Sequence, residues 1–133
     1  MYYDISADDG KLVEAATDVL RRCYRDIRHT VGAAVLCSSG NVYAGVNVEA
    51  CGYGPCAEAV AFGMAFSNAE TEIKSVVAVM QNGEVLSPCG NCRQLIVDYA
   101  PDAMVILNVD GRTVKTQARN LLPGHYSSDF VEG

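Results

Sequence analysis

Two apolar segments joined through a helical one constrain the fold of this chain more than any other feature. The segments "IKSVVAVMQ" (73–81) and "AMVILNV" (103–109) are short, apolar and rich in β-branched residues, which is typical of buried strands. Between them, "CGNCRQLIVDYA" (89–100) is interpreted as a helix that Pro101 ends. Because a helix connects them, the two strands are expected to lie parallel in one sheet, with a right-handed crossover.

The rest of the chain extends this unit on both sides. A helix is predicted from Ser6 to about Arg28, because apolar residues recur there at helical spacing. The further expected elements are a hairpin of two strands (30–38 and 42–48), a helix (56–69), a fifth strand (113–116) and a last short helix (116–124). Helices and strands mixed in this order predict one domain over residues 1–133, with an α/β fold. The expected architecture is a three-layer α/β/α sandwich with a mixed five-stranded sheet.

The composition bounds the partners and the compartment. Half of the 133 residues are hydrophobic, and the net charge is −6. An acidic chain lacks the basic surface that a phosphate backbone requires, so a small uncharged or cationic ligand is expected rather than a nucleic acid. The N-terminus carries acids where a secretory signal carries positive charge, and no apolar run approaches the ~18 residues of a membrane span. A cytoplasmic protein without membrane contact is expected, in which six cysteines favour metal binding or catalysis over disulfides.

Two cysteines stand three positions apart in "SPCGNCRQ" (87–94), at the predicted start of a helix. At this spacing Cys89 and Cys92 share one helix face, and the unpaired N–H groups and positive dipole end there favour thiolate over thiol. Such a pair suits either a thiol oxidoreductase or a metal site. The pair lies late in the chain and follows Ser-Pro, which is not the usual context of a redox motif, so a metal is the preferred interpretation.

A third cysteine, Cys56 in "GYGPCAEAV" (52–60), also follows a proline at a predicted helix start, and Glu58 comes two residues later. If both helices lie on one sheet face, three thiolates can hold Zn²⁺ and leave one tetrahedral position open, which marks a catalytic zinc site. Water in that position loses a proton readily, and Glu58 is placed to take it. A fourth ligand from Cys51 would instead close the site and make it a structural zinc module, in which Glu58 has no task.

Five motifs follow the order and approximate spacing of the cytidine deaminase family: "VGAAV", "GVNVE", "PCAE", "SPCGNCRQ" and "LLPG". The chain resembles the small, single-domain, homotetrameric branch of this family. The resemblance implies hydrolytic deamination of the cytosine ring of a free nucleoside, cytidine or 2′-deoxycytidine, with release of ammonia. It also implies that Cys56, Cys89 and Cys92 bind zinc and that Glu58 is the catalytic proton shuttle.

The same resemblance implies four substrate-binding residues. Asn47 and Glu49 match the pair that holds the ribose hydroxyl, and Ala57 follows the first zinc ligand against the substrate. Tyr126, after "LLPG", matches an aromatic residue that stacks on the base from a neighbouring subunit. A homotetramer with shared sites is therefore expected.

The chain departs from many cytidine deaminases at several positions. Ala59 stands where an arginine often follows the catalytic glutamate, and the segment 53–56 is short. Both features resemble blasticidin S deaminase, a relative with the same chemistry, which is the alternative activity. That relative tends to have an aromatic residue in place of Glu49, and cytidine deaminases often have phenylalanine in place of His29. The resemblance therefore predicts the chemistry and leaves the substrate open.

Three further side chains have a structural interpretation or an open one. Cys23 and Cys37 are interpreted as small core residues, which is the usual role of a lone cysteine. Arg93, next to Cys92, either offsets the charge of the thiolates or has only a structural role at the protein surface. The sequence leaves these two roles of Arg93 open.

Overall fold

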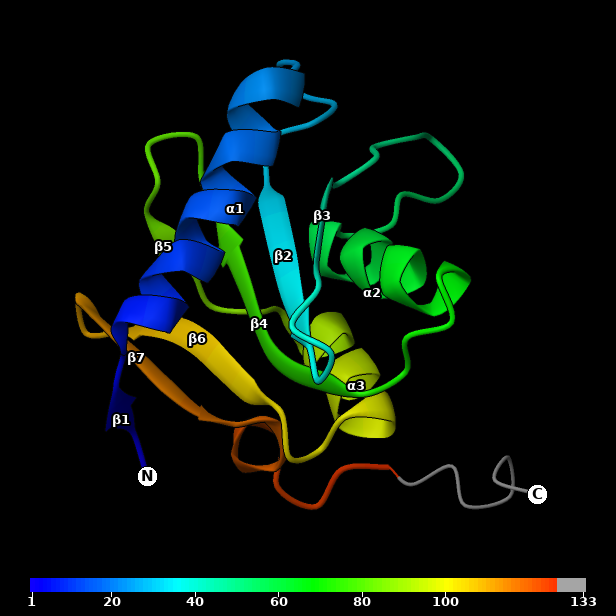
Figure 1. Ribbon diagram of the computed structural model, residues 1–133. Coiled ribbons are helices and arrows are strands. Elements are labelled where there is room, and N and C mark those ends of the chain that lie inside the picture. The colour runs from blue at the N-terminus through cyan, green and yellow to red at the C-terminus, as the bar shows by residue number, and fades with distance from the viewer. Residues whose placement is uncertain (127–133) are drawn as a thin grey trace.

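The computed structural model describes residues 1–126; residues 127–133, which include Phe130 of the C-terminal segment, lie outside the described part. One sheet runs in the order β1-β7-β6-β4-β2-β3, and β5 pairs with β4 beside this path (Figure 1). The strands are β1 (Tyr3–Asp4), β2 (Gly32–Cys37), β3 (Val42–Val46), β4 (Ile73–Val79), β5 (Val85–Leu86), β6 (Met104–Val109) and β7 (Arg112–Gln117). The helices are α1 (Ala7–Cys23), α2 (Ala57–Ser67), α3 (Gly90–Tyr99) and the short 3-10 helix η1 (Ala118–Leu121).

Helices cover both faces of the sheet, so the expected three-layer α/β/α sandwich is confirmed. α1 lies on one face, and α2 and α3 lie on the other (Figure 1). Strand β2 shows the alternation that this arrangement requires. Ala33 and Val35 belong to the core on the α2 and α3 side, whereas Ala34 belongs to the core on the α1 side. Both faces of the strand are therefore apolar.

The strands β4 and β6 are parallel neighbours, as the helix between them predicts. Ser75 pairs with Met104 and Val76 with Val105, while the other strand pairs run antiparallel. In the described part of the chain the sheet has seven strands and not five, because β1 and β5 add one short strand each. Two residues are too few to show a periodic pattern, so the sequence does not predict these strands.

The first helix begins as predicted and ends earlier than predicted. Ser6 is its N-cap and forms a capping box with Asp9, which satisfies backbone N–H groups at the helix start. The helix ends at Cys23 and not near Arg28, because the backbone at Tyr24 is extended, with ψ of 133°. Within residues 1–126, no helix has the length and apolarity that a membrane span needs.

The two cysteines interpreted as core residues have different surroundings. Cys37, at the end of β2, is buried in the core on the α2 and α3 side, as expected. Cys23 is exposed, so its assignment to the core is wrong. It is the last residue of α1, in a turn whose neighbours Arg21 and Arg22 are also exposed.

Candidate metal centre and substrate pocket

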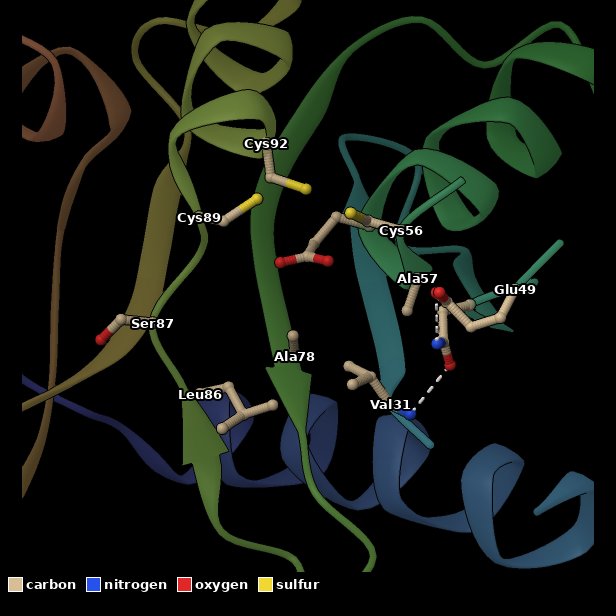
Figure 2. A pocket seen from close by; sticks show the side chains of 11 residues that line it. Val31, Glu49, Cys56, Ala57, Ala78, Leu86, Ser87, Cys89 and Cys92 are labelled. Carbon is tan, nitrogen blue, oxygen red and sulfur yellow. Dashed lines mark hydrogen bonds between the residues drawn. The ribbon is translucent and has the colours of Figure 1, made fainter. Parts of the chain in front are cut away.

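Two helices begin with a cysteine on the same side of the sheet. Cys56 is the N-cap of α2 and Cys89 is the N-cap of α3, and each follows a proline. Neither side chain caps its own helix. Cys92 lies in the first turn of α3. The three Sγ atoms all lie within 4.8 Å of one another, and Figure 2 shows them converging from the two helices.

This donor set fits zinc. Thiolate is a ligand that zinc prefers, and in a tetrahedral site with Zn–S distances of about 2.3 Å the sulfurs lie about 3.8 Å apart. The Sγ atoms of Cys56, Cys89 and Cys92 lie within 4.8 Å of one another, which is compatible with binding a single ion. The two helix N-termini also direct positive dipole ends at the sulfurs, which offsets part of the charge of three thiolates.

The three thiols differ in how readily they ionise. Hydrogen bonds from the backbone N–H groups of Cys92 and Asn91 hold the pKa of Cys89 below its ordinary value, against the effect of burial. Burial raises the pKa of Cys56, and burial together with the Glu58 carboxylate raises that of Cys92. A cation between the sulfurs would reverse the last two shifts, because it stabilises thiolate charge.

Glu58 lies beside the sulfurs but is not a member of their group. It is the second residue of α2 and is only 6% exposed. Burial raises the pKa of its carboxyl group, and hydrogen bonds from its own backbone N–H and from Cys92 offset part of this effect. A carboxyl group with a raised pKa near a metal can accept a proton and release it again. The surroundings of Glu58 therefore suit proton transfer.

One pocket connects these groups. Its volume is about 220 Å³. In Figure 2 the three cysteines lie at one end, and the apolar side chains of Val31, Ala78 and Leu86 lie toward the other. The lining residues are Val31, Asn47, Glu49, Cys56, Ala57, Glu58, Ala78, Leu86, Ser87, Cys89 and Cys92. Seven of the eight site residues named from the sequence are thus brought together in one pocket.

Asn47 links the pocket wall to the carboxylate of Glu49. Its Oδ1 accepts hydrogen bonds from the backbone N–H groups of Thr30 (2.8 Å) and Val31 (3.0 Å). Its Nδ2 donates to Oε2 of Glu49 at 3.1 Å and to Oγ1 of Thr30 at 3.4 Å. The ring of His29 reaches the backbone oxygen of Asn47 at 2.8 Å, and Nδ1 is the donor because a carbonyl only accepts. Asn47 therefore orients Glu49 with all four of its side-chain hydrogen-bonding positions engaged.

Tyr126 is the site residue that does not join this pocket. Its side chain is 65% exposed and lies outside the pocket lining. Gln94 of α3 donates a hydrogen bond to its backbone oxygen at 3.1 Å. The role of Tyr126 at the site of a neighbouring subunit therefore stays an expectation.

Other pocket residues lacked a signal in the sequence. Leu86 is the last residue of β5 and Ser87 follows it, while Ala78 of β4 is the strand partner of Leu86. Because β5 has two residues, no pattern marks it, and Ala78 looks like any other residue of a buried strand. Val31 stands in the "VGAAV" motif, so its membership of the family motif was the sequence signal that could have placed it at the site.

Two open questions about charge and ligation are answered by the geometry. Arg93 donates from Nε to the backbone oxygen of Pro88 (2.8 Å) and from Nη1 to that of Leu121 (3.2 Å), so it holds the start of α3 against η1. Cys51 is exposed and is not in the sulfur group. Three sulfurs without Cys51, with a buried carboxyl group beside them, define the site of a zinc-dependent hydrolase rather than a closed structural zinc.

Comparisons with known proteins agree with this class. The sequence model of the cytidine and deoxycytidylate deaminase zinc-binding region matches residues 6–108. A blasticidin-S deaminase of Bacillus cereus is 39% identical over 94% of this chain and 96% of its own length. A cytidine deaminase of Sporosarcina psychrophila is 36% identical over 74% of this chain and 76% of its own. The crystal structure of cytidine deaminase from Mycobacterium leprae has a TM-score of 0.77 at 28% identity, covering 89% of this chain and 99% of that one.

The chain belongs to the cytidine deaminase family. It is a zinc-dependent hydrolytic deaminase, with Cys56, Cys89 and Cys92 positioned to bind the metal ion. The interpretation of Cys89 and Cys92 as a separate redox pair is therefore rejected.

Proposed function

We propose that this protein deaminates the cytosine ring of a free nucleoside, cytidine or 2′-deoxycytidine, to the uracil nucleoside and ammonia. The observation that carries the proposal is a single pocket lined by the three converging cysteines together with Glu58 and Glu49. Blasticidin S is the second candidate substrate, because a relative named blasticidin-S deaminase matches nearly the whole chain.

Glu58 performs the proton transfers of the proposed reaction. Zinc held by the three cysteines would supply the nucleophile, since it lowers the pKa of a bound water toward ~7. Glu58 takes a proton from the water and gives it to ring N3, which makes C4 electrophilic. After the water oxygen bonds to C4, Glu58 relays the second proton to the exocyclic amine. The C4–N bond then breaks and ammonia leaves.

The rest of the pocket orients the substrate. Ala57 follows Cys56 directly, and its small, buried side chain leaves room for a flat ring beside the sulfurs. Val31 and Leu86 form apolar walls that exclude water from the ring. We place a sugar hydroxyl at Glu49, whose carboxylate is fixed by Asn47. Asn47 thereby contributes to sugar binding.

The working unit in this proposal is a homotetramer of single-domain subunits with shared sites. Within residues 1–126, the first strand β1 pairs with the last strand β7, so strands from both halves of the chain form one sheet, which supports one domain over 1–133. Large apolar side chains remain exposed, among them Tyr53, Tyr99 and Tyr126. Tyr126 would reach the base in a neighbouring subunit.

A direct assay tests the proposal. The purified protein is analysed for zinc, and the loss of cytosine absorbance is followed with cytidine, 2′-deoxycytidine, blasticidin S and free cytosine. One zinc per chain and turnover of a cytosine nucleoside are expected, with free cytosine the poorest substrate because it offers no hydroxyl to Glu49. Faster turnover of blasticidin S than of both nucleosides would reverse the ranking. Absence of zinc together with absence of turnover would contradict the proposed function.

A further inference from the structure

Residues 47–49 carry both side chains that we assign to the sugar, yet they belong to no helix or strand. They follow β3, which ends at Val46, and precede α2. Asn47 is buried, whereas Val48 and Glu49 are exposed. Little side-chain packing therefore holds the end of this segment, and its position depends on the bonds that its backbone makes.

Two neighbouring loops contact the backbone of the segment. Asn47 N–H donates to the backbone oxygen of Val31 at 3.2 Å, and Val48 N–H donates to that of Pro55 at 3.1 Å. A Cβ at Gly54 would lie only 2.5 Å from the backbone oxygen of Val48, so the loop before α2 lies directly against the segment. This contact leaves the segment no room to shift toward that loop.

Two side chains of the loop after α1 hold the carbonyl groups. Arg28 Nη1 donates to the backbone oxygen of Glu49 at 2.9 Å, and His29 Nδ1 donates to that of Asn47 at 2.8 Å. The Arg28 bond lies at the surface, where water competes for both partners, whereas the His29 bond is partly buried. Of the two side chains, His29 is therefore expected to fix the segment more strongly.

His29 makes this bond without touching the substrate. It does not line the catalytic pocket, so its ring acts only through the segment that it holds. The neutral ring donates from Nδ1 in one tautomer, and the protonated ring donates from both nitrogens. The bond to Asn47 is thus compatible with either charge state of the ring.

We propose that His29 is a positioning residue for sugar recognition. Its hydrogen bond to the backbone of Asn47 fixes the segment that carries Glu49, and thereby sets how strongly the enzyme prefers a substrate with the hydroxyl that Glu49 binds. This inference rests on the proposed deamination of a cytosine nucleoside.

The physical reason is the cost of a carbonyl group that loses its donor. Asn47 is only 6% exposed, so without His29 its peptide group turns to find another partner, and Glu49 moves with it. A shift of about 1 Å in a binding group is enough to weaken its contact with the substrate. The remaining backbone bonds limit the shift, so a change of about three- to tenfold is expected, as for one internal hydrogen bond.

The test uses four substrates with the same base: cytidine and its 2′-deoxy, 3′-deoxy and 5′-deoxy analogues. kcat/KM is measured on the zinc-loaded full chain for each of them. The hydroxyl preference is the ratio of cytidine to the analogue that reacts most slowly. Glu49→Ala, measured first, should lower this ratio, which identifies the missing hydroxyl as the one that Glu49 binds.

Three substitutions of His29 separate the hydrogen bond from the bulk of the ring. His29→Leu removes the donor, His29→Asn places an amide N–H near the position of Nδ1, and His29→Gln places it near that of Nε2. His125→Leu is the matched control, because His125 also contacts a backbone oxygen, that of Leu122 at 3.3 Å, outside the catalytic pocket. Any effect of this control through the neighbouring Tyr126 cancels in the ratio, since all four substrates carry the same base.

We expect the hydroxyl preference to fall about three- to tenfold in His29→Leu and in His29→Gln. It should be largely kept in His29→Asn and unchanged in His125→Leu. In the Glu49→Ala background, His29→Leu should have no further effect on the preference, because His29 acts through Glu49. Zinc content and Tm are measured for every variant.

An equal loss of kcat/KM on all four substrates in His29→Leu would show a purely structural role and overturn the inference. A further fall of the preference in the Glu49→Ala background, or a wild-type preference that Glu49→Ala leaves unchanged, would overturn it as well. If His29→Leu does not fold, the comparison of His29→Asn with His29→Gln decides, and equal preferences in these two refute the proposal. Turnover of cytidine upholds the proposed function in each of these cases, whereas failure of all four substrates to react overturns both.

Discussion

At the scale of single residues, the proposed chemistry depends on Glu58, a carboxyl group that water hardly reaches. Glu58 is 6% exposed, and burial raises the pKa of its carboxyl group above the ordinary value. Its position as the second residue of α2 places it two residues after the ligand Cys56 without making it a ligand itself. In the proposed mechanism, the cysteines therefore bind the metal ion and Glu58 transfers the protons.

Glu58→Gln should retain zinc and the fold but lose deamination. Glutamine has nearly the same shape but cannot carry the proton between water, ring and amine. A general acid–base group contributes about 10²–10⁴-fold, and a loss near the upper end is expected because one group serves several transfers. Zinc content and kcat are measured side by side, with exposed Glu14→Gln on α1 as control. Retention of more than about a tenth of the activity would exclude Glu58 as the shuttle.

Glu49→Ala should reduce sugar recognition. The change removes the carboxylate that Asn47 orients, so a substrate hydroxyl buried there loses its partner, and kcat/KM on cytidine should fall about 10–100-fold. Free cytosine, which has no sugar, should be affected much less. The ratio between the two substrates is the measurement, and an equal loss on both would show that Glu49 does not contact the sugar.

At the scale of elements, close packing of α1 on the sheet positions the hairpin that carries Asn47. A Cβ at Gly32 of β2 would lie 2.4 Å from the backbone oxygen of Ala16 and 2.8 Å from Cβ of Leu20, both in α1. Backbone atoms in a helix cannot move aside locally. Only glycine therefore permits this distance between helix and strand.

Gly32→Ala should lower the free energy of unfolding by about 1–3 kcal/mol, because α1 has to move away from β2. The expected result is a fall of several degrees in Tm. Gly10→Ala, within α1, is the matched control: outside its own stretch of helix no atom would lie within 4 Å of a Cβ there, and alanine should stabilise the helix by about 0.5–1 kcal/mol. Equal Tm values for wild type and Gly32→Ala would contradict the packing argument.

A salt bridge joins the start of α1 to β7. Lys115 Nζ lies 2.7 Å from Oδ2 of Asp9, and both side chains are largely buried. Burial opposes ionisation of Asp9, but hydrogen bonds from Lys115 and Ser6 prevail and hold its pKa below the ordinary value of 3.8. A carboxyl group with a lowered pKa stabilises the fold above its unfolded pKa, and this contribution is lost as the pH falls through the folded value.

Asp9→Asn should therefore destabilise the protein by about 1–2 kcal/mol at pH 7, where wild-type Asp9 is charged. The difference should shrink as the pH falls below 3.8, because wild-type Asp9 then takes up its proton. Urea unfolding of both proteins at each pH gives the difference between their free energies of unfolding. Zinc loss at low pH affects both proteins alike and cancels in this difference. A difference that stays constant down to pH 2 would show that the charge of Asp9 contributes nothing.

At the scale of the whole molecule, exposed apolar side chains and the position of Tyr126 support the proposed homotetramer. Tyr126→Ala should raise KM several-fold and leave zinc content unchanged, because stacking of an aromatic ring on a base is worth about 1–3 kcal/mol and involves no coordination. Light scattering measures the assembly at the assay concentration. A fully active monomer would contradict both the tetramer and the shared site.

Local patterns in the sequence predict most of the layers and the metal group. Three thiols at two proline-led helix starts can bind one ion only if the helices lie together, and the structure meets this condition for "PCAE" and "SPCGNCRQ". The parallel pair of β4 and β6 follows in the same way from the helix between them. The strands β1 and β5 carry no such pattern, because their two residues form strands only where a neighbouring strand is already present.

By itself, the sequence determined the layered architecture and the candidate cysteine group, because residue type and local spacing carry them, and the resemblance of its motifs to a known family added the chemical class. Only the tertiary structure decided the end of α1 at Cys23, the use of Arg93 for backbone oxygens and the side chains that complete the pocket. It also placed the loop of residues 25–28 beside Glu49, whose backbone oxygen accepts a hydrogen bond from Arg28. The contact of Arg93 with Leu121 and the lining of the pocket join residues far apart in the chain, and their energies depend on distances that no local pattern encodes.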